Sequence, residues 1–126
     1  MIKDIEIVKN YDKSIGKINC NIGQLNQVFL NIFLNALDAV DGQGKIEVTT
    51  KKVEGHVRIT IKDSGTGISK ENLKKVFDPF FTTKEVGKGT GLGMSISHGI
   101  IKNQGGSIEV RSEVGEATEF VISLPK

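Results

Sequence analysis

Glycine is most concentrated at residues 87–93, which read GKGTGLG and come directly before a segment with helical spacing. A glycine loop that leads into a helix gathers unpaired backbone N–H groups and the positive end of the helix dipole, an arrangement typical of phosphate binding. The alternative is a flexible hinge. The spacing does not fit G-x-G-x-x-G, because the position of the third glycine is taken by another residue in every frame. It does not fit the Walker A pattern either, because no Gly-Lys pair is followed by Ser or Thr. We favour a phosphate site outside those two motif classes.

A second glycine cluster, DSGTGI at residues 63–68, directly follows a predicted strand. One interpretation is a tight strand-to-helix turn in which Asp63 is the turn residue. The other is a ligand site, because glycine lets a planar group approach the backbone and the Asp63 carboxylate can accept a hydrogen bond from an amino group such as that of adenine. Taken by itself, the cluster leaves both interpretations open.

Amide side chains form a polar stripe on the helix predicted at residues 23–40. At about 100° per residue, one narrow face carries Gln24, Gln27, Asn31, Asn35 and Asp38. Apolar residues flank it on both sides, with Val28, Phe29, Ile32, Ala36 and Ala39 on one and Leu30, Leu34 and Leu37 on the other. Amide oxygens can bind a hard cation, and Asn31 and Asn35 point the same way. A hydrogen-bond network between helices is the alternative.

Residues 77–84 read FDPFFTTK, an aromatic cluster followed by two hydroxyls and a cation. Phe77, Phe80 and Phe81 are either core plugs beneath a loop or anchors of a lid whose Lys84 reaches phosphates.

Elements that position these segments follow from the hydrophobic periodicity. Alternation predicts strands at residues 2–8, 15–21, 45–53, 56–62, 107–112 and 118–124. The first two are expected to pair as a hairpin through a turn at residues 12–14, and the next two through a turn at Glu54-Gly55. Helices are expected at residues 23–40, at 70–76 after Ser69 as N-cap, and at 91–103, with a loop at 77–90. The glycine pair Gly105-Gly106 is expected to end the last helix. This predicts one α+β domain, residues 1–126, built as a two-layer α/β sandwich.

Composition excludes several classes of protein. Seventeen basic and fifteen acidic residues give a formal charge of +2, too balanced for a partner such as nucleic acid or an acidic membrane. One Cys and two His exclude a disulfide framework and a standard zinc site. No apolar run approaches the ~18 residues of a membrane span, and the N-terminus lacks a signal-peptide core. We expect a soluble cytoplasmic domain without contact to nucleic acid or membrane.

In their order and spacing, the four segments resemble the catalytic and ATP-binding domain of bacterial sensor histidine kinases, within the GHKL superfamily. The N box is carried by Gln27, Asn31, Asn35 and Ala36, the G1 box by DSGTGI, the F box by FDPFF and the G2 box by GKGTGLG. The four boxes together are specific and extend over essentially the whole chain. The resemblance implies the Bergerat fold, in which a mixed, mainly antiparallel sheet packs on three helices and a flexible lid closes over ATP.

The resemblance also implies roles for single residues. Asp63 corresponds to the aspartate that accepts from the adenine amino group, and Gly67 to the glycine beside the base, in a box that includes Gly65 and Ile68. Asn35 corresponds to the Mg²⁺-binding asparagine, and Asn31 is implied to support the metal and the phosphates of ATP or ADP.

Phosphate contacts are implied for the G2 box, namely Lys88, Gly89, Thr90, Gly91, Leu92 and Gly93. Thr118 resembles the threonine on a late strand that meets adenine through water.

Hydrolysing relatives have Glu where this chain has Asn31. A carboxylate can take a proton from water and an amide cannot, so the sequence favours transfer of the γ-phosphate to a protein acceptor. Asn31 and Lys84 are the expected catalytic residues, with Mg²⁺ and Lys84 or Lys88 neutralising charge.

The implied acceptor is a histidine on a dimerisation and phosphotransfer domain, which we expect to be absent from this chain. Neither His56 nor His98 has an acidic neighbour of the acceptor type. The chain by itself is therefore expected to bind nucleotide without efficient autophosphorylation, and to reach a response regulator only indirectly. The parent protein can be membrane-anchored or not. Two alternatives are a nucleotide-binding regulatory module without kinase activity and a serine kinase of the anti-sigma type, which the F box disfavours.

Overall fold

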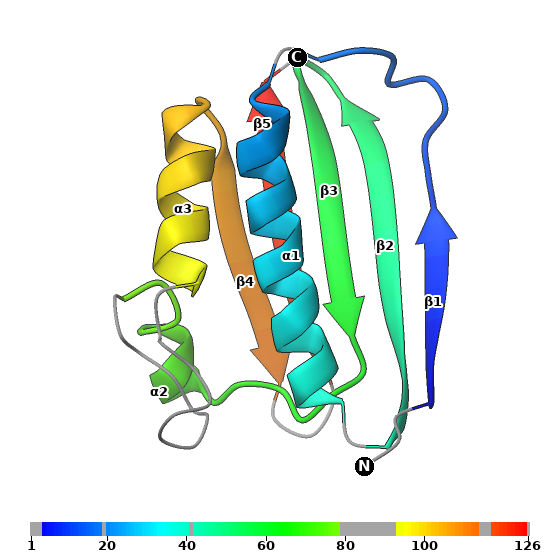
Figure 1. Ribbon diagram of the computed structural model, residues 1–126, viewed down its shortest axis with the longest axis vertical. Coiled ribbons are helices and arrows are strands. Elements are labelled where there is room, and N and C mark those ends of the chain that lie inside the picture. The colour runs from blue at the N-terminus through cyan, green and yellow to red at the C-terminus, as the bar shows by residue number, and fades with distance from the viewer. Residues whose placement is uncertain (1–3, 19, 41, 79–92, 114–116, 126) are drawn as a thin grey trace.

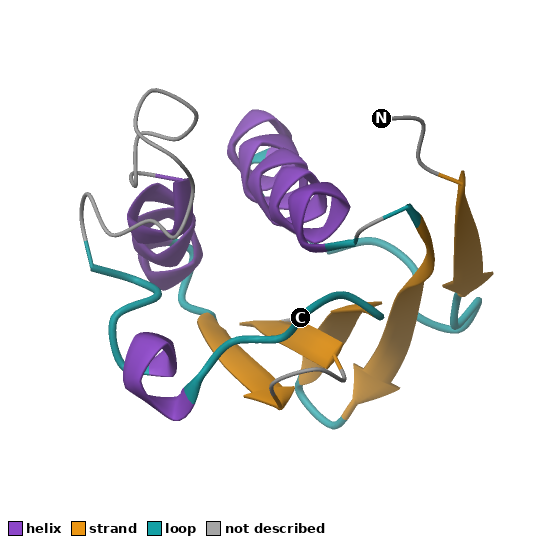
Figure 2. Ribbon diagram, turned by 90° about the horizontal axis from the view of Figure 1, so that it is seen from below, coloured by secondary structure: helices purple, strands orange, loops and turns teal. Residues whose placement is uncertain are grey.

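The computed structural model describes residues 4–18, 20–40, 42–78, 93–113 and 117–125. In these described ranges five strands form one sheet, two long helices cover one of its faces, and a short third helix lies beside its edge (Figures 1 and 2). The strands are β1 (Asp4–Asn10), β2 (Gln43–Val53), β3 (His56–Asp63), β4 (Ser107–Glu113) and β5 (Ala117–Pro125). The helices are α1 (Ile22–Ala39), α2 (Lys70–Leu73) and α3 (Gly93–Asn103). The predicted α+β two-layer sandwich is confirmed.

The sheet has the order β1-β2-β3-β5-β4 and is mixed. Strand β1 runs parallel to β2, with Ile7 beside Ile46, and every other neighbouring pair is antiparallel. The hairpin predicted from the Glu54-Gly55 turn is β2–β3, and Gly55 has the positive φ of 78° that such a turn requires. The β3–β5 pairing places Asp63, at the end of β3, beside Thr118, near the start of β5.

The strand predicted at residues 15–21 is wrong, because none of its described residues is in a strand. The expected hairpin is also wrong, since β1 takes β2 as a parallel partner. A parallel pair needs a crossover connection, and residues 11–21 together with α1 provide it. The turn at residues 12–14 is confirmed: the Asp12 carboxylate accepts from the Ser14 backbone N–H (2.9 Å) and from that of Lys52 (2.9 Å). The Ser14 hydroxyl also donates to the Asp12 carboxylate. These hydrogen bonds lower the pKa of Asp12 to about 2, and the bond from the Ser14 hydroxyl has the largest effect.

Helix α1 is formed by a sequence without proline that begins at a good cap. The Asn21 side chain accepts a hydrogen bond from the Gln24 backbone N–H at 3.0 Å, which satisfies one of the unpaired donors of the first turn. The inward face of the helix packs on the sheet and forms much of the core through Leu25, Val28, Ile32 and Ala36. Tight packing here fixes the height and rotation of the polar stripe above the sheet.

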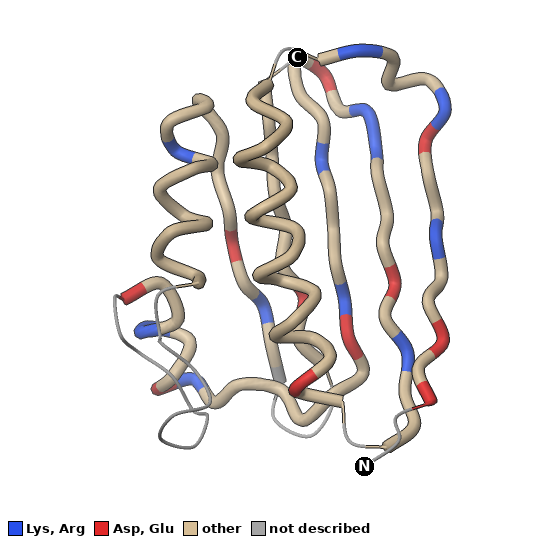
Figure 3. Tube along the Cα trace, viewed as in Figure 1, with Lys and Arg blue, Asp and Glu red and all other residues tan. Residues whose placement is uncertain are grey.

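The outer face of α1 exposes a row of leucines. Leu30, Leu34 and Leu37 are 54%, 48% and 37% exposed, so one of the two apolar walls expected beside the polar stripe faces solvent. Figure 3 shows that α1 carries a single charged residue, Asp38, near its C-terminal end. The polar stripe therefore has the core on one side only.

Helices α2 and α3 have recognisable ends. The Ser69 hydroxyl caps α2 by accepting from the Asn72 backbone N–H (3.2 Å), as predicted, although α2 ends at Leu73 and not at residue 76. Helix α3 ends in the predicted glycine pair, where Gly105 has φ of 78° and the Gly106 N–H donates to the Ile101 carbonyl at 2.9 Å. The lid was expected at residues 77–90, and its part beyond residue 78 lies outside the described residues.

No helix in the described ranges is both long and apolar enough to span a bilayer.

Candidate nucleotide site

The carboxylate of Asp63 lies at the end of β3 and is only 4% exposed. One of its oxygens accepts a hydrogen bond from the Gly65 backbone N–H at 2.8 Å. Burial raises the pKa of Asp63 above its ordinary value of 3.8, and the bond from Gly65 opposes that rise. Among the described residues no ion pair is formed by Asp63, and a buried carboxylate that lacks a cationic partner is costly and typical of binding sites.

The two glycines after Asp63 have reasons within the fold. A Cβ on Gly65 would lie 2.5 Å from the Ala39 carbonyl oxygen, so this position must be glycine for the loop to pack on the end of α1. Gly67 has φ of 75°, a left-handed conformation that favours glycine. The Thr66 backbone N–H also donates to the Ala39 carbonyl (3.2 Å). Of the two interpretations left open, the tight turn is therefore confirmed, and the turn holds Asp63 beside the C-terminal end of α1.

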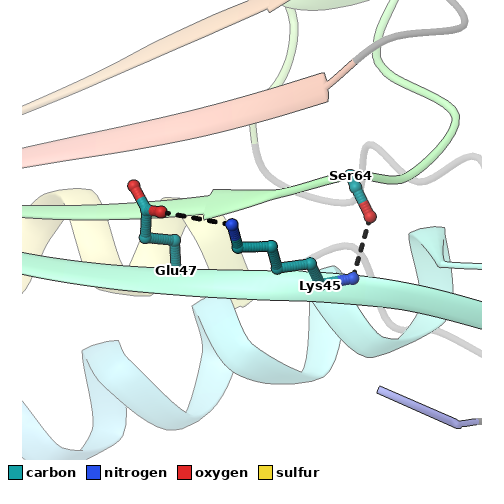
Figure 4. A network of polar contacts seen from close by, with 3 residues as sticks. All are labelled: Lys45, Glu47 and Ser64. Carbon is teal, nitrogen blue, oxygen red and sulfur yellow. Dashed lines mark hydrogen bonds and ion pairs between the residues drawn. The ribbon is translucent and has the colours of Figure 1, made fainter. Parts of the chain in front are cut away.

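Ser64 continues the β2–β3 pairing beyond the last residue of β3. Its hydroxyl accepts from the Lys45 backbone N–H at 2.9 Å, and its own N–H donates to the Lys45 carbonyl at 3.0 Å (Figure 4). The Lys45 ammonium lies 3.7 Å from the Glu47 carboxylate, two residues further along β2. The two bonds between Ser64 and Lys45 fix the start of the loop after Asp63.

Thr118 is the register partner of Asp63 across the β3–β5 pair and is likewise 4% exposed. Its hydroxyl lies 3.0 Å from the hydroxyl of Ser112 on β4, which also receives the Ile68 backbone N–H at 2.7 Å. Three candidate residues, Asp63, Ile68 and Thr118, are thus brought together at one end of the sheet. Ser112 was not predicted, although its position six residues before Thr118 across a short turn could have indicated the contact.

Asn31 joins α1 to α3. Its amide nitrogen donates to the Gly93 carbonyl and to the Ser97 hydroxyl, both at 3.1 Å, and its oxygen accepts from the Gln27 amide at 3.3 Å. Ser97 is fully buried and donates in turn to the Gly93 carbonyl (2.8 Å). The hydrogen-bond network between helices, one of the two alternatives for the polar stripe, is therefore present at Asn31. Ser97 was also not predicted.

Asn35 lies one turn after Asn31 and is half-buried. Asn31 and Asn35 lie on the same side of α1, so the second alternative for the polar stripe, a cation site, is compatible with the geometry. The part of the chain that the structure describes holds no cluster of three or more His, Cys, Asp or Glu. Amide oxygens are suitable ligands for Mg²⁺, which usually keeps several waters and takes substrate phosphate as well. The donor set of Asn31 and Asn35 therefore fits this ion in chemistry.

Phe77 contacts α3. Its ring lies 5.2 Å from the ring of His98, with an angle of 40° between the planes, and it packs against the core. The core-plug interpretation is therefore confirmed for Phe77, and the ring contact gives His98 a packing role. Phe80 and Phe81 lie outside the described residues.

The remaining candidate residues also lie outside the described residues. These are Lys84, Lys88, Gly89, Thr90, Gly91 and Leu92. Among the glycines of this segment, Gly93 is described: it is the first residue of α3, and a Cβ there would meet the Asn31 side chain at 3.5 Å, an ordinary contact. The C-terminal ends of α1 and β3 and the N-terminal end of α3 all point downward in Figure 1, and the bond from Asn31 to the Gly93 carbonyl joins α1 to the start of α3.

The fold is similar to that of histidine kinase catalytic domains of known structure. The catalytic domain of histidine kinase ThkA matches with a TM-score of 0.85 at 33% identity, over 97% of this chain and 79% of that chain. The mycobacterial sensor histidine kinase MprB matches with a TM-score of 0.85 at 26% identity, over 97% and 82%. The predicted resemblance and fold are confirmed.

The family model described as histidine kinase-, DNA gyrase B-, and HSP90-like ATPase matches residues 20–126, and the chain belongs to this family. It is 41% identical to the sensor kinase CckA of Brucella abortus over 98% of this chain. It is 39% identical to sporulation kinase C of Bacillus subtilis over 99%, and 37% identical to the sensor histidine kinase ZraS of Escherichia coli over 98%. It spans only 15%, 29% and 26% of those three relatives.

Proposed function

We propose that residues 1–126 form the catalytic and ATP-binding domain of a sensor histidine kinase, which binds Mg-ATP and presents the γ-phosphate to a histidine on a separate dimerisation domain. The observation that carries the proposal is the pair of buried acceptors, Asp63 and Thr118, side by side at the end of the sheet. Buried acceptors need donors, and the exocyclic amino group of adenine is a donor of the right kind. The relatives that match nearly the whole chain are named as kinases.

In this proposal Asp63 receives the adenine amino group, and the Gly65–Ile68 turn lies along the base. Asn35 and Asn31 hold the ion through their amide oxygens, and Mg²⁺, when bound, neutralises phosphate charge. Asn31 cannot accept a proton from water, so the residues favour transfer to a protein acceptor over hydrolysis. Lys84 and the residues 88–93 are proposed to contact the phosphates.

The proposed partners follow from the same role. The acceptor histidine lies on the protein's own dimerisation and phosphotransfer domain, and a response regulator receives the phosphate from it. The relatives that share this domain are much longer than this chain, which is compatible with such a neighbour. We propose that the domain works in the cytoplasm, where ATP is available, and contacts neither nucleic acid nor membrane.

Calorimetric titration of the chain with ADP and a non-hydrolysable ATP analogue, with and without Mg²⁺, tests the proposal. We expect saturable binding that strengthens when Mg²⁺ is present. The matched control is Asp63→Asn, which keeps the shape of the side chain but turns an amide donor toward the adenine amino group, and should weaken binding at least tenfold. An absence of binding at millimolar nucleotide would overturn the proposal.

A further inference from the structure

The hydroxyl of Ser112 has three polar neighbours within hydrogen-bond distance. The Ile68 backbone N–H donates to it at 2.7 Å, and it donates to the Ala117 carbonyl at 2.7 Å. The Thr118 hydroxyl lies 3.0 Å away. A serine hydroxyl has one proton and two lone pairs, so it can make one donation and accept two hydrogen bonds.

This count fixes the direction of the bond between Ser112 and Thr118. The single proton of Ser112 is used on the Ala117 carbonyl, and one lone pair is used by the Ile68 N–H. Only the second lone pair remains, and therefore Thr118 must donate to Ser112. The Thr118 proton is then turned toward β4, and both lone pairs of its oxygen are left for groups elsewhere.

Those lone pairs lie beside the Asp63 carboxylate. Residues directly opposite in an antiparallel pair have their side chains on the same face of the sheet, about 5 Å apart at Cβ. Asp63 and Thr118 are such a pair, and both are 4% exposed. With its proton held by Ser112, Thr118 presents an acceptor next to an acceptor, and a group placed there has to supply hydrogens.

We propose that Ser112 is a positioning residue that fixes the Thr118 hydroxyl as an acceptor beside Asp63, and so makes the site select purines with a 6-amino group. The inference rests on the proposed nucleotide-binding function and deepens it. The amino group is received by both acceptors, directly or through a bridging water. Ser112 also holds the Ile68 backbone, so the same hydroxyl fixes the turn after Asp63 and the orientation of Thr118.

The test compares the affinity for ATP with that for purine riboside triphosphate, the analogue in which hydrogen replaces the 6-amino group. Wild type should prefer ATP. Ser112→Ala should reduce this preference about threefold to tenfold, the factor expected for one lost neutral hydrogen bond. The matched control is Ser107→Ala, the same change on β4 at the other end of the strand, where Ser107 lies opposite Ser123. It should leave the preference unchanged.

A second pair of variants separates orientation from general support of the fold. Thr118→Val keeps the shape of the side chain and removes the acceptor, so it should reduce the preference as Ser112→Ala does. Adding Ser112→Ala to Thr118→Val should reduce it no further, because Ser112 acts through Thr118. If a melting curve shows Ser112→Ala to be unfolded, Ser112→Cys, which has a similar size and only weak hydrogen bonding, should lower the preference in the same way.

Three outcomes decide against the inference or its premise. Equal weakening of ATP and of the analogue by Ser112→Ala would mean that Ser112 only supports the fold. A wild type that binds both nucleotides equally would overturn the selection of the amino group while nucleotide binding stands. A wild type that binds neither would overturn the proposed function itself.

Discussion

The side-chain amide nitrogen of Asn31 lies 3.1 Å from the backbone carbonyl of Gly93 and donates a hydrogen bond that joins α1 to the first residue of α3. The residues are 62 positions apart in sequence. Asn31 belongs to the polar stripe on α1, and Gly93 is the last glycine of the segment GKGTGLG. A direct hydrogen bond therefore joins two of the four sequence motifs.

Removal of the Ser97 hydroxyl should weaken the link between α1 and α3. Ser97 is fully buried, and its hydroxyl bonds to both Asn31 and Gly93, so Ser97→Ala should lower the free energy of unfolding by about 1–2 kcal/mol. Urea unfolding of Ser97→Ala, Asn31→Ala and the double variant measures the coupling, which should be about 1 kcal/mol. Strict additivity of the two changes would show that the bond between Asn31 and Ser97 contributes nothing to stability.

Asn35→Ala should weaken nucleotide binding more in the presence of Mg²⁺ than in its absence, because it removes a proposed ligand of the ion. The matched control is Asn26→Ala, an amide on the same helix. Nine residues at about 100° each place Asn26 on the opposite side of α1, and it is exposed. Titrations with and without Mg²⁺ check this prediction. Equal losses under both conditions for Asn35→Ala would contradict the ligand role.

Gly65→Ala should destabilise the protein by about 1–3 kcal/mol, because the added methyl group meets the Ala39 carbonyl oxygen at 2.5 Å and must displace the loop or the end of α1. Gly99→Ala is the control with the opposite sign. Gly99 lies within α3 with nothing within 4 Å of a Cβ, so the change should stabilise by about 0.5–1 kcal/mol. Thermal or urea unfolding of both variants tests the pair, and a neutral Gly65→Ala would refute the steric argument.

Asp63 should make the stability of the unliganded protein depend on pH. Burial raises its pKa in the folded state above the ordinary 3.8, so the folded protein holds this proton more tightly than the unfolded chain does. The stability that the folded protein gains from holding this proton is fully present below about pH 4 and is lost as the pH rises through the raised pKa of Asp63. Asp63→Asn should remove this loss and be more stable than wild type at pH 7. Urea unfolding from pH 4 to 7 measures the effect. Parallel pH curves for the two proteins would speak against a buried, destabilising carboxylate.

Most of the fold could be predicted, because its elements have local causes. The proline-free stretch of residues 23–40, the alternation in β2 and β3 and the glycine pair after α3 are local signals, and they predicted α1, the β2–β3 hairpin and the end of α3 correctly. The strand predicted at residues 15–21 failed because alternation says nothing of which strand is available as a partner. Strand β1 already pairs with β2, and that choice depends on residues more than thirty positions away.

For the candidate site, the spacing of motifs identified the residues but not the contacts between them. Asp63 and Thr118 were singled out separately, and their adjacency comes from the β3–β5 register. Ser97 and Ser112 were missed because a serine has no pattern of its own, and each gains its role from a partner that folding brings near. The cluster at residues 63–68 left a tight turn and a ligand site open, and the close approach to the Ala39 carbonyl is sufficient cause for glycine at position 65.

The parallel edge strand described above has a further consequence for association between molecules. Strand β1 covers one side of β2, an eleven-residue strand with several β-branched residues, and in turn leaves its own outer backbone groups unpaired. That outer edge is short and carries Asp4, Glu6 and Lys9, all exposed, which discourages another strand from adding to it. If β1 detached, the longer edge of β2 would take its place as a template for intermolecular pairing. Strand β1 is therefore expected to protect the protein from aggregation by covering the edge of β2.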